Sequence, residues 1–425
     1  MPASVTIMDQ LPKSLHNGSR DKVRLAYLVS HPIQYQAPLL RRIAGEPDID
    51  LIVFFGSDFS VKGYKDEGFG GVGVKWDIPL LDGYRHEFLP VLRDNATVSP
   101  TTPMNYGIAS RLRGASGKPA FDALWVHGYA SVNALHGMTA AKALGIPVLL
   151  RAESWLGDRE RSGAKLAAKR LFFRALAQMV DCVLPIGTLN TEYWRHYLGE
   201  DFPLFLMPYA VDNEYFRRRS LDAAPCRGEL QAELSLDPSR PVILFASKLQ
   251  GRKRACDLVE AYKQLSPAPG VEPHPYLVIV GDGEERAALE HSAKQTGFGS
   301  VRFCGFRNQS ELPRFFDLAT VFVLPSRHEP WGLIVNEVMN AGRAVIVSDE
   351  VGCQRDLITD GVEGMVFPAG DVDALADALR RTLATPETAA AMGQRALERI
   401  GAWNFEEDVS GLRRALAAVT RKITA

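Results

Sequence analysis

The sequence predicts an α/β protein built from two doubly wound, Rossmann-like domains that face each other across a cleft. First, 425 residues are too many for one typical hydrophobic core. Second, short apolar runs alternate with stretches of helical periodicity from Val23 onward, which is typical of a parallel sheet covered on both faces. Third, this alternation restarts beyond a polar stretch that follows Phe216, so we expect a second sheet.

The predicted strands fall into two series. The first series comprises residues 23–30, 49–56, 121–128, 147–154 and 182–187. The second series comprises residues 242–247, 276–281, 301–306, 321–326, 344–349 and 364–368. We expect helices between most consecutive strands.

These elements divide the chain into four segments. We expect residues 1–21 to be a mobile tail, 22–210 to be the first domain and 211–402 the second. Residues 403–425 contain an amphipathic stretch with no strand after it. We therefore expect this last helix to pack back toward the first domain.

The composition excludes several classes of protein. The formal net charge is −1, so the total gives no support for nucleic-acid binding, which needs a basic excess. The five cysteines are scattered without a Cys-x-x-Cys pair, which predicts neither disulfides nor a zinc site and fits a reducing cytoplasm. No run reaches the roughly 18 apolar residues that a spanning helix needs, and no cluster of Asp or His suggests a metal site.

The segment "EPWGLIVNE" places two carboxylates after a predicted strand of the second domain. Open α/β sheets bind ligands at the carboxyl ends of their strands. Glu329 lies in the strand-to-helix loop, and the amides of Gly332, Leu333 and Ile334 lie near a helix N-terminus, which favours a phosphate. Glu337 lies about one turn into that helix, where its carboxylate can accept hydrogen bonds from two vicinal hydroxyls.

A second strand end carries cations. Lys248 follows the strand 242–247, and Lys253 lies five residues later, before the next predicted helix. Ammonium groups at this position can neutralise a diphosphate leaving group. Each lysine alone is better explained as a solvated surface charge, whereas for the pair after this strand the two explanations are equally good.

Residues 205–400 resemble the donor-binding domain of the retaining glycosyltransferases of family 4, which have the GT-B fold. The most specific feature is the Glu-x7-Glu signature that ends at Glu337. The resemblance implies that Glu329 contacts the transferred sugar, that Glu337 binds the ribose hydroxyls, and that Lys248 and Lys253 surround the diphosphate. Lys248 stands where an arginine is more usual, so the bidentate hydrogen-bonding fork is lost there.

Other loops match the family by position. The resemblance implies that Gly281, Asp282 and Gly283 border the nucleotide and that the backbone around Phe306 is a platform for the base. An ordinary βα turn explains these residues almost as well. The glycine-rich stretch 68–76 neither follows the first strand nor opens a helix, so we interpret it as a mobile loop over the acceptor side.

The first domain matches the family less closely, and we expect it to bind the acceptor. Its first strand is followed by "SHPIQYQAP" instead of a glycine-rich loop, and this stretch resembles a polysaccharide-associated subset of the family. His31, Gln34 and Tyr35 are therefore candidates for contact with donor phosphate or acceptor. A histidine packed within the loop is the alternative.

Three further residues near strand ends are candidates. Glu153 stands where many relatives carry a histidine close to the sugar, so it is a catalytic candidate. Arg151 shares its face of the predicted strand and is a candidate for acceptor contact, and the alternative is an ion pair between the two. His127, which ends another strand, is the nearest histidine that could take the missing catalytic role.

Residues 159–179 form a predicted basic amphipathic helix that includes Arg161, Lys165, Lys169 and Arg170. Such a helix either lies on an anionic membrane or packs on its own sheet with a solvated basic face.

The resemblance implies a cytoplasmic, metal-independent hexosyltransferase that uses a UDP- or GDP-sugar in polysaccharide or glycoconjugate biosynthesis. Its acceptor would be a glycan or a lipid-linked saccharide, and it would need no cofactor. The alternatives are a nucleotide-sugar epimerase of the same fold and a catalytically silent nucleotide-sugar-binding protein.

Overall fold

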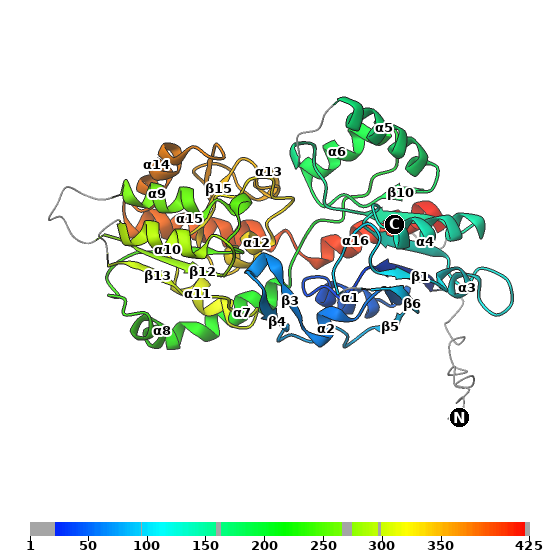
Figure 1. Ribbon diagram of the computed structural model, residues 1–425, viewed down its shortest axis with the longest axis horizontal. Helices are drawn as coiled ribbons and strands as arrows, with labels where there is room; N and C mark the ends of the chain where they lie inside the picture. The colour runs from blue at the N-terminus through cyan, green and yellow to red at the C-terminus, as the bar shows by residue number, and fades with distance from the viewer. Residues whose placement is uncertain (1–21, 95, 159–162, 266–273, 296–298, 421–425) are drawn as a thin grey trace, which may run out of the picture.

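The computed structural model describes residues 22–94, 96–158, 163–265, 274–295 and 299–420. These residues form two α/β domains that lie side by side, each built around a six-stranded sheet (Figure 1). The predicted mobile tail, residues 1–21, lies outside the described residues.

The first sheet has the order β10-β9-β8-β1-β2-β5, and all of its strands are parallel. Its strands are β1 (Val23–Val29), β2 (Ile49–Phe55), β5 (Arg85–Phe88), β8 (Ala123–His127), β9 (Val148–Arg151) and β10 (Cys182–Val183). The first predicted series is confirmed with shorter ends, while the edge strand β5 was not predicted.

The second sheet has the order β13-β12-β11-β14-β15-β16 and is also parallel throughout. Its strands are β11 (Val242–Ala246), β12 (Tyr276–Val280), β13 (Val301–Phe303), β14 (Val321–Leu324), β15 (Ala344–Ser348) and β16 (Gly364–Phe367). All six predicted strands are confirmed. The strand order reverses between β11 and β14, which is where a doubly wound sheet opens a ligand-binding crevice.

Helices cover both faces of each sheet. The first domain contains α1 (Ala37–Ala44), α2 (Phe59–Lys62), α3 (Ile108–Arg113), α4 (Val132–Ala143), α5 (Gly163–Ala177) and α6 (Thr188–Leu198). The second half contains α7 (Asn213–Ala223), α8 (Arg227–Glu233), α9 (Ala255–Lys263), α10 (Arg286–Gln295), α11 (Leu312–Leu318), α12 (Leu333–Met339), α13 (Gln354–Leu357), α14 (Val372–Thr382), α15 (Pro386–Gly401) and α16 (Phe405–Thr420).

The strands read as continuous apolar runs because both faces of each sheet are buried. In β11, Leu244 packs in one core cluster, whereas its neighbours Ile243 and Phe245 pack in the cluster on the opposite face. In β1, Leu25 and Leu28 likewise enter opposite clusters. Alternate side chains therefore have equally apolar surroundings, as expected for parallel strands between helices.

The last helix, α16, returns to the first domain as predicted. Leu412 and Leu416 are fully buried in the same apolar cluster as Leu25 of β1. Beside them Arg151, at the end of β9, donates a hydrogen bond of 3.1 Å to Asp408 of α16, and both side chains are almost completely buried. The two domains are thus joined by α16 as well as by the chain that leads into α7.

Residues 68–74 of the glycine-rich stretch 68–76 are part of a hairpin, whereas the sequence predicted a mobile loop. Strand β3 (Tyr64–Asp66) pairs antiparallel with β4 (Val72–Val74), and a 3-10 turn, η1 (Glu67–Phe69), joins them. We call residues 64–74 the cleft hairpin. In Figure 1 it extends from the first domain toward the second, where Asp66 forms an ion pair with Lys248.

Candidate active site

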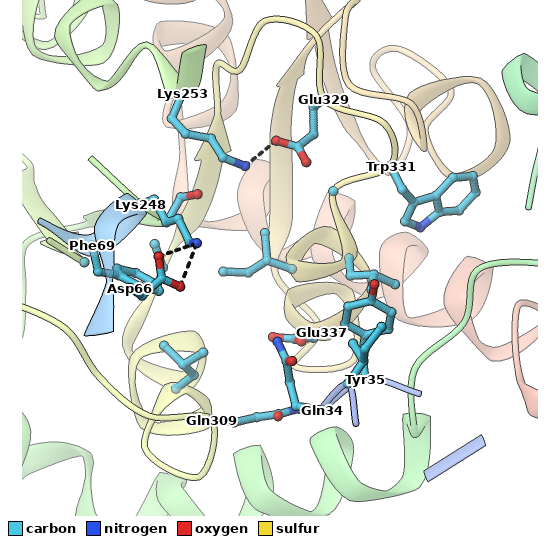
Figure 2. Close-up of a pocket in the computed structure, with 18 of the residues that line it drawn as sticks. Gln34, Tyr35, Asp66, Phe69, Lys248, Lys253, Gln309, Glu329, Trp331 and Glu337 are labelled. Atoms are coloured by element: carbon cyan, nitrogen blue, oxygen red, sulfur yellow. Dashed lines mark hydrogen bonds and ion pairs between the residues drawn. The ribbon is translucent and has the colours of Figure 1, made fainter. Parts of the chain in front are cut away.

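A cavity of about 460 Å³ lies between the two domains, at the carboxyl ends of both sheets. Figure 2 shows that side chains from both domains enter it. The sequence-predicted residues that line it are His31, Gln34, Tyr35, Glu153, Lys248, Lys253, Gly281, Phe306, Glu329, Gly332, Leu333, Ile334 and Glu337. Most of the candidate site is therefore brought together in one space.

Glu329 lies in the loop after β14 and contacts two cations. Its Oε2 accepts a hydrogen bond of 3.1 Å from Arg252 and another from the Lys253 ammonium. Burial lowers the pKa of Lys253, and the adjacent Glu329 carboxylate opposes that effect. The pair therefore places one carboxylate and one ammonium next to each other at the wall of the cavity (Figure 2).

The turn before α12 needs a glycine. Gly332 has φ 92°, and a Cβ there would lie 3.0 Å from Val351 and 3.1 Å from Leu324. The first intrahelical bond runs from the Val335 amide to the Gly332 carbonyl. The amides of Gly332, Leu333 and Ile334 precede it, and these residues line the cavity.

Glu337 projects from α12 into the same cavity (Figure 2). Only 9% of the residue is exposed, and burial raises the pKa of its carboxyl to about 8. A buried carboxyl that faces a cavity can bind a pair of hydroxyls, because it offers two oxygens at one place.

The loop after β12 packs closely on the loop after β11. A Cβ at Gly281 would collide with the Ser247 carbonyl, and one at Gly283 would collide with the Leu249 carbonyl. Only Gly281 lines the cavity, since Asp282 turns to Arg286 with an ion pair of 2.6 Å. The structure thus places one of the three predicted loop residues directly at the site.

Phe306 lines the cavity beyond β13, as expected for a base platform, although its aromatic partner was not predicted. Its ring centroid lies 4.9 Å from that of Phe69 in the cleft hairpin, with the two planes at 73°.

In the first domain, Glu153 is contacted by two tyrosine hydroxyls and one imidazole. The Tyr35 hydroxyl donates to it at 3.1 Å, the Tyr209 hydroxyl also donates to it, and His127 Nε2 lies 3.5 Å away. Burial would raise the pKa of Glu153, but the hydrogen bond and charge of His127, with smaller effects of Tyr209 and Tyr35, hold it below its ordinary value. Glu153 is therefore a carboxylate at neutral pH.

His31 is a neutral imidazole at the cavity wall. Burial, reinforced by His127, lowers its pKa to about 4. Its Nδ1 lies 2.9 Å from the Ser30 hydroxyl, and its ring stacks on Phe59 with centroids 4.6 Å apart. His31 is thus packed within its loop and also lines the cavity, so the two interpretations of this histidine do not exclude each other.

Two first-domain candidates do not reach the cavity. Arg151 is 1% exposed and donates to Asp408 and to the carbonyls of Met207 and Pro208, so it joins α16 to the first domain instead of binding acceptor. The predicted alternation with Glu153 fails because β9 ends at Arg151. His127 does not line the cavity, and its Nε2 lies 3.5 Å from Glu153.

The sequence did not point to several residues that line the cavity. They are Asp66, Phe69, Trp76, Tyr209, Arg252, Gln309 and Trp331. The sequence showed the hairpin only as a glycine-rich stretch and did not reveal the roles of Asp66 and Phe69, because their partners lie in the other domain.

Within the described part of the chain, no group of three or more His, Cys, Asp or Glu side chains is arranged to hold a metal ion. The helices described there include none that is both long and apolar enough to cross a membrane.

The fold and the cavity define a two-domain α/β protein with a glycine turn at the start of α12 and two carboxylates in its interdomain cleft. Residues 227–399, which lie in the second domain, match the family model "Glycosyl transferases group 1". The whole chain has the GT-B fold of two Rossmann-like domains.

Two curated glycosyltransferases are similar in sequence to part of this chain. Alpha-D-kanosaminyltransferase of Streptomyces kanamyceticus is 31% identical over 42% of this chain and 45% of the relative. The lipopolysaccharide core biosynthesis glycosyltransferase LpsE of Rhizobium meliloti is 32% identical over 40% of this chain and 47% of the relative. This chain thus spans less than half the length of each of these relatives.

Among solved structures, Anabaena HepE in complex with UDP and glucose superposes with a TM-score of 0.67. The two chains are 16% identical, and the match covers 93% of this chain and 100% of HepE. At this identity the likeness concerns the fold.

Proposed function

We propose that this protein is a retaining glycosyltransferase that takes a hexose from a UDP- or GDP-sugar and passes it to an acceptor hydroxyl held by the first domain. The observation that carries the proposal is the convergence of Glu329, Glu337, Lys253 and the turn at Gly332 in one interdomain cavity. The family match of the second domain supports the donor class.

The residues of the second domain have distinct roles in this proposal. Glycosyl transfer passes through an oxocarbenium-like state while negative charge grows on the departing diphosphate. Lys248, Lys253 and the amides that begin α12 stabilise that charge, and fixed donors of this kind are strongest in a partly dry cleft. Glu329 accepts hydrogen bonds from the transferred sugar, and Glu337 binds the ribose hydroxyls.

Glu153 faces the reacting sugar from the first domain. As a carboxylate beside Tyr35 and Tyr209, it can stabilise positive charge on the sugar or accept the proton of the attacking hydroxyl. His127 is a positioning residue for this carboxylate. His31 and Gln34 line the same side and are candidates for acceptor contacts.

We propose a glycan or a lipid-linked saccharide as acceptor, in polysaccharide or glycoconjugate biosynthesis at the cytoplasmic face of a membrane. Helix α5 supports this through Arg170, Leu171 and Arg174, which are exposed on one side of the helix, Leu171 being 68% exposed. Lys165 is also exposed but lies on another side of the helix. Lys169 is not part of the exposed surface around Leu171, since its ammonium lies 4.5 Å from the ring centre of Tyr197. Arg161 lies outside the described residues.

The first test is thermal unfolding of the intact protein and of Glu337→Ala with UDP or GDP. A ligand bound by the folded state raises the midpoint, so we expect one nucleotide to raise it in the intact protein and not in the variant. When the matching sugar donor is supplied in EDTA, the protein should then glycosylate an acceptor or slowly hydrolyse the donor. An altered sugar without acceptor would instead indicate an epimerase, and binding without turnover would indicate a silent protein.

A further inference from the structure

The cleft hairpin of the first domain contacts the Lys248 side chain that the proposed function assigns to the donor diphosphate. The Lys248 ammonium lies 2.9 and 3.0 Å from the two carboxylate oxygens of Asp66. The Asp66 side chain is 11% exposed and that of Lys248 33%, so the pair is partly shielded from water. The Lys248 ammonium is therefore already paired with an anionic group of the protein (Figure 2).

The tip of the same hairpin contacts the aromatic wall of the cavity. The rings of Phe69 and Phe306 are in edge-to-face contact with centroids 4.9 Å apart, which leaves no space for a third ring between them. The Lys248 ammonium lies 4.9 Å from the centre of the Phe69 ring. One short turn thus presents a carboxylate to the cation and an aromatic ring to the base platform.

We propose that the cleft hairpin is a built-in competitor of the sugar-nucleotide donor. Asp66 takes the position of the diphosphate on Lys248, and Phe69 takes the position of the base against Phe306. Donor binding exchanges both contacts and lifts the tip of the hairpin out of the site. This inference rests on the proposed function, because it assumes that a nucleoside diphosphate binds at Lys248.

Electrostatics and the small size of the hairpin make the exchange feasible. A diphosphate on Lys248 would lie beside the Asp66 carboxylate, and two like charges at such distances repel each other strongly in a partly buried site. Strands β3 and β4 have three residues each, and a two-stranded hairpin of this size is marginally stable alone. Behind it, Asn308 holds the Lys75 carbonyl at 2.7 Å, so the tip can move while the segment after it stays attached.

The test compares Asp66→Asn with Glu67→Gln by calorimetric titration with UDP and with GDP. Both variants remove one negative charge from the same turn, but Glu67 is exposed and only Asp66 pairs with Lys248. We expect Asp66→Asn to bind the preferred nucleotide roughly fivefold more tightly than the intact protein, since a partly buried pair no longer has to be broken. Glu67→Gln should bind like the intact protein.

A double variant checks that the gain depends on Lys248. In a Lys248→Met background, Asp66→Asn should change nucleotide affinity by less than about twofold, because the competing contact no longer exists. If Asp66→Asn, with Lys248 present, binds the nucleotide no more tightly than the intact protein, the inference is overturned, because Asp66 would then not compete with the nucleotide. If the intact protein and every variant bind neither nucleotide, the proposed function fails first.

Hydrogen exchange provides a second readout on the intact protein. If the hairpin is displaced, amides of residues 64–74 should exchange faster when the preferred nucleotide is bound. Slower exchange would show that the hairpin closes over the donor, and the competitor assignment would be wrong while nucleotide binding itself stands.

Discussion

Binding of the nucleotide should depend on pH through Glu337. Burial raises the pKa of this carboxyl to about 8, so at pH 7 the protonated form outnumbers the carboxylate by about ten to one. The carboxylate can accept hydrogen bonds from both ribose hydroxyls, whereas the protonated acid uses one oxygen as a donor. If the carboxylate is the binding form, the association constant should rise nearly tenfold from pH 6 to 7, about fivefold from pH 7 to 8, and then level off.

The assay is calorimetric titration of the preferred nucleotide across pH 6–9 with the intact protein and with Glu337→Gln. The terminal phosphate of the nucleotide also titrates, so the informative quantity is the ratio of the two association constants at each pH. That ratio should rise with pH and flatten near pH 8, and the intact protein should release a proton on binding at pH 7. A ratio that stays constant with pH would refute the role of Glu337 as an ionised ribose acceptor.

The same pKa predicts the sign of a stability effect. The folded-state pKa of Glu337, about 8, lies above its ordinary value of 4.5, so the native state binds more protons than the unfolded state between these values. The free energy of unfolding of the intact protein should therefore fall, relative to that of Glu337→Gln, as the pH rises through this window.

Three further predictions concern other contacts of the structure. Arg151→Met should lower the free energy of unfolding by about 3–5 kcal/mol in denaturant titrations, because it leaves Asp408 buried without its cation. Adding Asp408→Leu should recover most of that loss. A double variant no more stable than the single one would contradict this reasoning. Gly332→Ala should cost about 1–3 kcal/mol, since φ is 92° and the new methyl meets two side chains; Gly361→Ala, at φ 80° with open space around it, should cost less in the same thermal melts. Lys253→Met should lower kcat about 10²–10³-fold with a smaller change in KM, if its ammonium stabilises the departing diphosphate; a change confined to KM would argue for a role in binding alone.

The parallel strands were predictable because each is buried on both faces. A run such as β11, Val242–Ala246, is apolar at every position, and local sequence is sufficient to recognise it. The edge strand β5 has the sequence Arg-His-Glu-Phe, with its first two residues exposed, so it lacks that signal. The three-residue strands of the cleft hairpin are too short for any periodicity to be recognised.

The site was predictable where its residues follow strands of one domain. Glu329, Lys248 and Gly281 each come after a recognisable strand of the second sheet, and the topology brings those strand ends together. Arg151 was placed incorrectly because its partner, Asp408, is 257 residues away in α16. Local alternation cannot reveal a partner at that separation, nor can it reveal the contact of Asp66 with Lys248.

The charges at the donor side of the cleft support the exchange that the hairpin suggests. Three cations, Lys248, Arg252 and Lys253, contact two carboxylates, Asp66 and Glu329. This group therefore carries one excess positive charge, and adding the two charges of a donor diphosphate to it would leave an excess of one negative charge. If the diphosphate instead replaces Asp66 on Lys248, three positive charges meet three negative ones. Because uncompensated charge in a partly buried site is costly, the neutral arrangement favours displacement of the hairpin over simple addition of the donor.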